Sequence, residues 1–179
     1  YGQSITEILA YREEKAQRLE ELLNYDSYLG QLQKEYEEQE KLLRENAKKM
    51  SAIRKQYAEE LAEQIRKELK DLNFLETNFE MEVTESAPLS ANGFDEACFL
   101  ISMNPGSPMR MLGDVASGGE LSRIMLAIKT VLADKDQTDT LIFDEIDVGI
   151  SGRTAQKVSE KMAVIARSRQ VLCITHLAQ

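Results

Sequence analysis

The stretch TLIFDEID, from Thr140 to Asp147, decides the fold of this chain. A short apolar run of β-type residues ends in two adjacent acids, Asp144 and Glu145. In parallel sheets, ligands bind at the carboxyl ends of the strands, where an Asp can hold Mg²⁺ together with phosphate oxygens. Glu145 could then polarise or deprotonate an attacking water. Taken alone, the motif also fits two surface acids that follow a buried strand.

The elements after this strand indicate an α/β fold. A helical pattern runs from Thr154 to about Arg167, and the apolar run Gln170 to Thr175 predicts a second buried strand. Strand, helix and strand in this order predict parallel pairing. The second strand ends at His176, the single histidine of the chain. A lone histidine is usually structural, but at this strand end it could also sense a γ-phosphate.

A third motif, ASGGELSR, precedes a helical stripe of apolar residues that starts at Leu121. Ser117 and Glu120 have the spacing of a capping box, which by itself explains a helix start. It does not explain Gly118 and Gly119, because glycine weakens a helix. Without Cβ atoms the backbone N–H groups of a helix N-terminus are open to an anion. The motif therefore predicts a phosphate contact built on a helix cap.

The chain changes character near Asn73. Before that point it is rich in Glu, Lys, Gln and Leu and contains no Pro, and its apolar residues follow a 3.5-residue repeat. The repeat is carried by Leu29, Leu32, Tyr36, Leu43, Met50, Ile53 and Tyr57, and it restarts at Leu61, Ile65, Leu69 and Leu72. We expect residues 1–73 to form a coiled-coil arm with a possible break near 24–30. A single amphipathic helix packed on its own domain is the alternative.

Residues 74–179 are expected to form the second domain. The alternation from Phe79 to Val83 predicts a half-buried strand, and Ala97 to Met103 predicts another. A turn is expected between them, and a loop from Pro105 to Val115. Both cysteines, Cys98 and Cys173, lie in apolar runs and are expected to be buried free thiols, as in a reducing compartment.

Bulk composition limits the possible functions. The 179 residues carry a formal net charge of −9, which disfavours non-specific binding of nucleic acid by this chain alone. No signal peptide opens the sequence, and no apolar run reaches the length of a membrane span. We therefore expect a soluble, cytoplasmic protein with no membrane partner.

The order of the motifs narrows the class. A glycine-rich helix start, then a strand with Asp-Glu, then a strand with His is the order found in ATPases of the ABC class. The long predicted coil points to their SMC-like branch. The phrases VASGGELSRIMLAIKT and TLIFDEIDVGISGRTAQKV closely resemble the RecN family of bacterial DNA repair proteins. The resemblance covers the region from about Asn73 onward, and the coil fits the returning arm of that family by position.

This resemblance implies an ABC/SMC-type ATPase head of which this chain is the C-terminal lobe. Ser117, Gly118 and Gly119 would match the ABC signature, beside Glu120 of the cap, and would contact the γ-phosphate of ATP held by the opposite head of a dimer. Asp144 and Glu145 would match the Walker B acid that holds Mg²⁺ and the catalytic base.

The remaining site residues also follow from the resemblance. Asp147 would begin the D-loop at the dimer interface, and His176 would match the switch histidine. Arg123 is expected to form a structural or interfacial ion pair. DNA would be handled by the full-length protein, associated with the nucleoid.

One departure from the family pattern is clear, because no G-x-x-x-x-G-K-[ST] loop occurs in the sequence. We therefore expect a fragment, truncated after His176, whose partners are the N-terminal half that carries this Walker A loop and a second head in a homodimer. Such a fragment is expected to be inactive alone. The alternative is a structural coiled-coil interaction module without nucleotide chemistry. The predicted long arm disfavours a transporter subunit.

Overall fold

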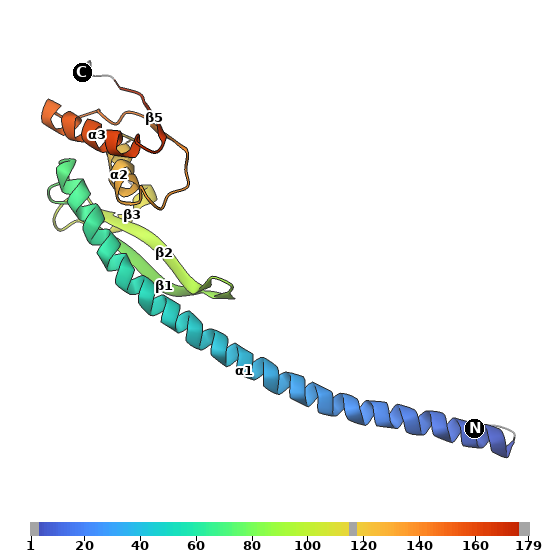
Figure 1. Cartoon of the computed structure of the whole chain (residues 1–179). Helices are drawn as coiled ribbons and strands as arrows, with labels where there is room; N and C mark the ends of the chain where they lie inside the picture. The colour runs from blue at the N-terminus through green and yellow to red at the C-terminus, as the bar shows by residue number, and fades with distance from the viewer. Residues whose placement is uncertain (1–3, 115–117, 176–179) are drawn as a thin grey trace. The chain divides into compact units, whose positions relative to one another are not determined.

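The structure, a computed structural model, describes residues 4–114 and 118–175 (Figure 1). Its elements in chain order are helix α1 (Ile5–Asp71), strands β1 (Asn78–Ser90), β2 (Gly93–Ser102) and β3 (Arg110–Met111), the 3₁₀ turn η1 (Leu112–Asp114), helix α2 (Gly118–Val131), strand β4 (Thr140–Phe143), helix α3 (Gly152–Ile165) and strand β5 (Gln170–Cys173). The chain divides into two compact units, Tyr1–Lys49 and Met50–Gln179.

Helix α1 runs without interruption through the region where a break was expected, so the prediction of a break near 24–30 is wrong. A single interior glycine costs a helix only about 1 kcal/mol, and the flanking Leu, Glu, Lys and Gln residues favour helix. A Cβ atom added at Gly30 would meet no neighbour, and the backbone there is not in the left-handed region. Gly30 therefore weakens the helix without ending it.

The end of α1 is set by a glycine-type cap in which an asparagine takes the place of glycine. Asn73 has φ of 70°, in the left-handed region that asparagine tolerates. The N–H of Asn73 donates to the Lys70 carbonyl at 3.1 Å, and the N–H of Phe74 donates to the Leu69 carbonyl at 3.0 Å. These two bonds form a Schellman motif. The change in composition near Asn73 therefore marks the end of the helix.

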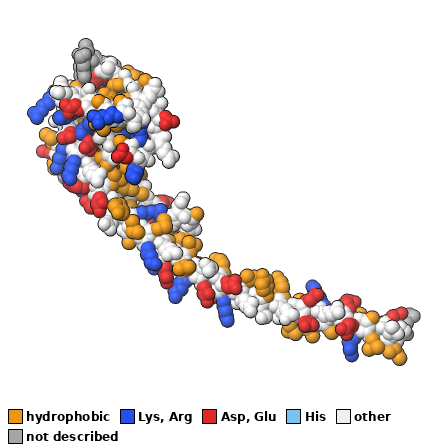
Figure 2. All heavy atoms as spheres, viewed as in Figure 1, with side chains coloured by type: hydrophobic (Ala, Val, Ile, Leu, Met, Phe, Trp, Pro, Cys, Tyr) orange, Lys and Arg blue, Asp and Glu red, His pale blue; other side chains and the backbone are white. Residues whose placement is uncertain are grey.

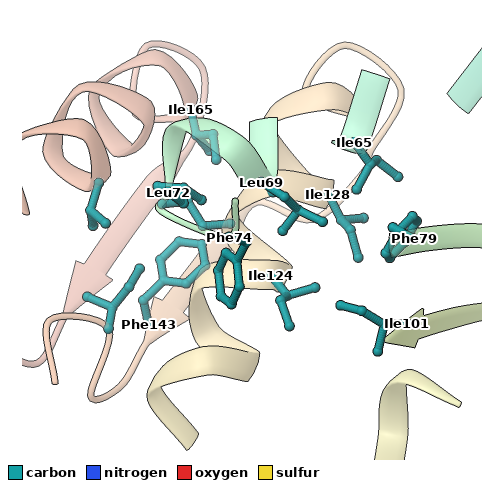
Figure 3. Packing of buried hydrophobic residues seen from close by; sticks show 14 of the residues in the cluster. Ile65, Leu69, Leu72, Phe74, Phe79, Ile101, Ile124, Ile128, Phe143 and Ile165 are labelled. Carbon is teal, nitrogen blue, oxygen red and sulfur yellow. The ribbon is translucent and has the colours of Figure 1, made fainter. Parts of the chain in front are cut away.

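The domain boundary lies earlier than the predicted boundary after residue 73. The second compact unit starts at Met50, so the last turns of α1 belong to it. Ile65, Leu69 and Leu72 are each at most 1% exposed and lie in the same core cluster as Phe79 and Ile124 (Figure 3). The composition of these turns resembles the rest of the arm, but their apolar face is covered by the lobe. For these turns the alternative of a helix packed on its own domain is correct.

The first sheet has the order β1-β2-β3, and its pairs are antiparallel. Phe79 pairs with Ile101 in the register, and both side chains are buried under α1. Arg66 of α1 donates to the Phe79 carbonyl at 2.8 Å, which fixes the helix against the start of β1. The two predicted strands are confirmed. Part of the expected loop, however, forms β3 and η1.

The second sheet consists of β4 and β5, which pair in parallel as predicted, with Thr140 opposite Gln170 and Phe143 opposite Cys173. The mixed α/β prediction is thereby confirmed. Buried and exposed side chains alternate along β4: Phe143 is 4% exposed, whereas the neighbouring Ile142 is 66% exposed. One face of this sheet lies on the core, and the other is open in the described part of the chain.

The open face corrects two predictions of burial. β5 was expected to be a buried strand, yet its side chains are exposed or half-buried, and Cys173 is exposed. Cys98 on β2 is half-buried, because it points away from the core side of its sheet. Both cysteines are free thiols, as expected. The apolar composition therefore predicted the strand β5 correctly, but it did not predict that the side chains of this strand are largely exposed.

The apolar repeat of α1 is solvent-exposed where it precedes the lobe. Within Tyr1–Lys49, Leu29, Tyr36 and Leu43 are 45%, 63% and 49% exposed, and Figure 2 shows apolar side chains recurring along the helix. The coiled coil stays a prediction, because it requires a partner helix. Despite this apolar stripe, no helix within residues 4–114 and 118–175 combines the length and apolarity that crossing a bilayer requires.

Truncating Ile65 tests whether the end of α1 belongs to the core. We expect Ile65→Ala to lower the free energy of unfolding of the lobe by about 2–5 kcal/mol, because it leaves a cavity in a fully buried site. Val164→Ala on α3, where the side chain is 45% exposed, is the control and should change it by less than about 0.5 kcal/mol. Urea denaturation measures both. Equal small effects would contradict the shared core.

Replacing Gly30 tests the continuity of α1. We expect Gly30→Ala to stabilise the helix locally by about 1 kcal/mol. Slower amide hydrogen exchange in the neighbouring turns would measure this gain. Gly93→Ala is the contrasting variant and should destabilise, because φ there is +88° and a Cβ atom would lie 3.2 Å from Arg54 Nη1. Faster exchange around residue 30 would instead indicate a broken helix.

Candidate functional site

The candidate site lies where the N-terminus of α2 meets the loop after β4. Gly118 and Gly119 begin α2, and Asp144 and Glu145 follow β4 directly and are exposed. Ser122, one turn into α2, donates its hydroxyl to the Asp144 carbonyl at 2.7 Å. The structure therefore brings the predicted glycine pair and the predicted acid pair together within one lobe.

The glycine pair is explained by this close approach. A Cβ atom on Gly119 would lie 2.7 Å from the Glu145 carbonyl oxygen and 3.3 Å from Arg123 Nη1. A Cβ atom on Gly118 would lie 2.9 Å from Oε2 of the Glu145 side chain. The backbone of the loop after β4 thus reaches the helix start because Gly119 lacks a side chain, and Gly118 leaves room for the Glu145 carboxylate. The Glu145 carboxylate also lies near the positive end of the α2 dipole, where a negative charge is favourable.

Glu145 has an unusual backbone. Its φ of 53° is in the left-handed region, which costs a non-glycine residue about 1–2 kcal/mol. The conformation is held by neighbours, since the Glu145 carbonyl accepts the N–H of Val148 at 3.1 Å and faces Gly119. Strained residues that the surroundings hold in place cluster at functional sites.

Arg123 holds the loop on α2. The residue is 7% exposed, and its Nη1 donates to the carbonyl oxygens of Ile146 at 3.1 Å and Val148 at 2.9 Å. Its guanidinium carbon lies 5.6 Å from the centre of the Phe74 ring, within cation–π range. Burial lowers the pKa of Arg123 below its ordinary value, and the negative charge of Glu120 opposes that shift. Within the described residues Arg123 therefore bonds to backbone carbonyls, and an interfacial ion pair stays a prediction.

Asp147 connects the loop to the end of β5. It is 4% exposed, and its carboxylate accepts the hydroxyl of Thr175. The carbonyl of Phe143 accepts the N–H of Ile174 at 2.9 Å, so the two strand ends stay together past the sheet. Asp147 therefore links the loop to Thr175 inside the lobe. Its side chain is buried here, and its position at a dimer interface stays a prediction.

Two predicted site residues, Ser117 and His176, lie outside the described residues. Glu120 is in the first turn of α2, beside Arg123 in a shared polar cleft. Sequence reasoning missed Ser122 and Thr175 as partners of the acidic loop. No sequence pattern marks Ser122 as a partner of the loop. Thr175 could have been predicted, because it directly precedes His176 at the end of the same apolar run.

The described residues contain no group of three or more His, Cys, Asp or Glu side chains placed to hold a metal ion. Mg²⁺ requires fewer protein ligands, because it keeps waters and takes one or two carboxylates together with phosphate oxygens. Asp144 is exposed at the strand end and offers one such carboxylate. The donor set therefore fits a magnesium ion that arrives with a nucleotide and does not fit an ion held by protein alone.

The geometry has counterparts among known structures. The fold resembles the crystal structure of the Smc head domain with an extended coiled coil, bound to the C-terminal domain of ScpA, from Pyrococcus furiosus. The likeness has a TM-score of 0.56 at 17% identity over 95% of this chain and 45% of that one. The chain thus has the mixed α/β fold of an SMC head.

Curated relatives define the family more narrowly. The chain is 40% identical to the DNA repair protein RecN of Bacillus subtilis and 41% identical to that of Halalkalibacterium halodurans, each match covering 100% of this chain. A further match is RecN of Treponema pallidum, 38% identical over 99% of the chain. No protein-family model matches the sequence. The chain belongs to the RecN family, and it spans about a third of the length of these relatives.

Alanine at the two glycines tests the close approach at the site. We expect Gly119→Ala to destabilise the lobe by about 1–3 kcal/mol, because its Cβ atom meets a backbone carbonyl that cannot move freely. Gly118→Ala should cost less, since the end of the Glu145 side chain can shift. Gly113→Ala, where a Cβ atom would meet nothing, is the matched control. Thermal unfolding measures the order, and a reversed order would contradict the geometry.

Proposed function

We propose that this chain is one part of an ATP-dependent DNA repair ATPase and supplies half of a composite ATP site. The observation that carries the proposal is the close approach of Gly118 and Gly119, at the start of α2, to the loop that carries Asp144 and Glu145. The named function of the curated relatives, DNA repair, supports the biological setting. The SMC head fold supports the ATPase class.

Each residue has a proposed role in that site. The glycine pair, with Ser117 and Glu120, presents backbone N–H groups to the γ-phosphate of an ATP held by a second head. Asp144 holds the Mg²⁺ ion, which neutralises phosphate charge when it is bound. Glu145 accepts a proton from, or orients, the attacking water. His176, which follows β5 in the sequence, senses the γ-phosphate.

The Glu145 carboxylate already lies at the start of α2, where a γ-phosphate would bind. Two anions cannot share one helix N-terminus without a cation between them. The carboxylate must therefore rotate away from the glycine pair when a phosphate arrives, while Arg123 holds the backbone of the loop in place. In this proposal ATP binding releases Glu145 for its role with water.

The proposed partners follow from what the site lacks. No loop of the G-x-x-x-x-G-K-[ST] type occurs in this sequence, so the phosphates need the N-terminal half of the protein and a second head in a homodimer. DNA would be bound through the full-length protein, since this chain carries a net charge of −9.

The Glu145→Gln variant of the full-length protein tests the proposal. Glutamine keeps the size of the side chain but cannot accept a proton, so ATP hydrolysis should fall by about 10²–10⁴-fold. Binding of ATP should be unchanged or tighter, because the repulsion between carboxylate and γ-phosphate is removed. Steady-state phosphate release and fluorescent nucleotide titration measure the two effects.

The matched control is Glu160→Gln on α3, another exposed glutamate, which pairs with Lys157 at 2.8 Å. It should change neither quantity by more than about twofold. Unchanged hydrolysis in Glu145→Gln would exclude Glu145 as the base. If Ser117→Arg also left ATP-driven head dimerisation intact, a structural coiled-coil module without nucleotide chemistry would be the better description.

A further inference from the structure

Two neighbouring side chains of α2 hold the acidic loop, residues 144–150, on both sides of Glu145. Before Glu145, the hydroxyl of Ser122 donates to the Asp144 carbonyl at 2.7 Å. After it, Nη1 of Arg123 donates to two further carbonyls of the loop, at 3.1 and 2.9 Å. The left-handed backbone at Glu145, with φ of 53°, therefore lies between two anchored segments.

Arg123 and Glu145 are connected through a short turn. The Glu145 carbonyl accepts the N–H of Val148 at 3.1 Å, which closes a turn over residues 145–148. The carbonyl of Val148 in turn accepts a hydrogen bond from Arg123. The position that a Cβ atom of Gly119 would take lies 2.7 Å from the Glu145 carbonyl oxygen and 3.3 Å from Arg123 Nη1. A displacement of Arg123 would therefore reach Glu145 through a single residue, Val148.

The surroundings of Arg123 are unusual for an arginine. The residue is 7% exposed, although arginine is rarely buried unless it is paired. Its acceptors are neutral carbonyls, and its Nε is buried without a hydrogen-bond partner in the part of the chain that the structure describes. Burial of a charge and of an unpaired donor costs free energy, and such groups often have a functional reason. That cost is explained if the guanidinium is needed where it lies.

Arg66 shows how an arginine supports the same lobe at a distance from the acidic loop. Its guanidinium also donates to a backbone carbonyl, that of Phe79 at 2.8 Å. It is in addition paired with Glu59 at 2.6 Å and with Glu63 at 3.0 Å, and its side chain is 21% exposed. The charge of Arg66 is thus neutralised and partly solvated. Arg66 is therefore a matched comparison for Arg123.

The guanidinium of Arg123 is itself supported from the end of α1. Its carbon lies 5.6 Å from the centre of the Phe74 ring, and Phe74 is 8% exposed. The N–H of Phe74 closes the cap of α1 by donating to the Leu69 carbonyl at 3.0 Å. A guanidinium is attracted to an aromatic ring both as a cation and by packing. The position of Arg123 therefore depends on a residue that the end of α1 fixes.

We propose that Arg123 is the positioning residue of the acidic loop and sets the backbone of Glu145 for its action on the attacking water. This role rests on the proposed function, in which Glu145 is the base. Arg123 contacts neither nucleotide nor water in this scheme. It holds the turn 145–148 against α2, and Phe74 holds the guanidinium. A displacement of about 1 Å at a catalytic group can slow a reaction by about 10²-fold.

Arg123→Met in the full-length protein tests the proposal. Methionine keeps an unbranched side chain but cannot donate to the loop carbonyls, so kcat for ATP hydrolysis should fall by about tenfold or more. The Kd of ATP, measured by fluorescent nucleotide titration, should stay within about threefold, because no phosphate contact is removed. Arg66→Met is the matched control and should leave kcat within about twofold of the wild type. Unchanged kcat in Arg123→Met would overturn the proposal.

Amide hydrogen exchange examines the loop without turnover. In the nucleotide-free full-length protein, peptides that cover residues 144–150 should exchange faster in Arg123→Met than in the wild type, because the N–H of Val148 is protected only while the turn is held. Arg66→Met should leave the exchange of this segment unchanged. Equal exchange in all three proteins would mean that Arg123 does not hold the turn, and the proposal would be wrong.

Phe74→Leu supplies a second test if Arg123→Met does not fold. Leucine keeps an apolar side chain but removes the ring beneath the guanidinium, so kcat should fall severalfold while the Kd of ATP is unchanged. The control is Phe99→Leu, since the Phe99 ring lies 5.3 Å from that of Phe79 and forms no such contact with Arg123. Circular dichroism melts set a temperature at which all variants are folded. Equal kcat values for the two leucine variants would contradict the proposal.

The double variant Arg123→Met, Glu145→Gln separates the role of Arg123 from the proposed function. If Arg123 acts only through Glu145, the double variant should hydrolyse ATP at most about twofold more slowly than Glu145→Gln alone. A further loss equal to that of Arg123→Met would overturn the positioning role. Wild-type hydrolysis by Glu145→Gln would instead overturn the proposed function. A loss in Glu145→Gln with none in Arg123→Met would overturn only the role of Arg123.

Discussion

The position of the acidic loop depends on one buried guanidinium. Arg123 donates to the carbonyls of Ile146 and Val148 and lies over the ring of Phe74. It therefore connects α2 to the loop after β4 and to the residue that closes the cap of α1. Neutral carbonyl partners leave its positive charge in place beside the site. Loss of this side chain would leave buried carbonyls unpaired and would release the loop from both elements.

The strained backbone of the site lies at Glu145, the residue proposed to act on the attacking water. Glu145 is held in a left-handed conformation, and two glycines allow its backbone and its carboxylate to reach the start of α2. The same loop is bridged to β5 through Asp147 and Thr175. The exposed acids are thus carried on a backbone fixed from two sides. A rigid support of this kind positions catalytic groups more accurately than a free loop does.

Sequence patterns predicted the strand ends well because they depend on local chemistry. The apolar run before Asp144 and a helix start at the glycine pair were identified, and parallel pairing of β4 with β5 followed from element order. Which apolar side chains become buried by tertiary packing was harder to predict. The same heptad-like pattern is exposed at Leu43 and fully buried at Ile65, since only the second faces the lobe. The break near Gly30 was overestimated because one glycine cannot outweigh its helical neighbours.

The shared end of α1 limits how this helix can move. A slide by one residue would advance it by about 1.5 Å and turn each side chain by about 100° around the axis. Ile65 and Leu69 would leave the core, and Glu68 and Asp71 would leave Lys161, to which both are bonded. The last turns of α1 are therefore fixed within the lobe. They can move only together with it, and they cannot rotate or slide against its core.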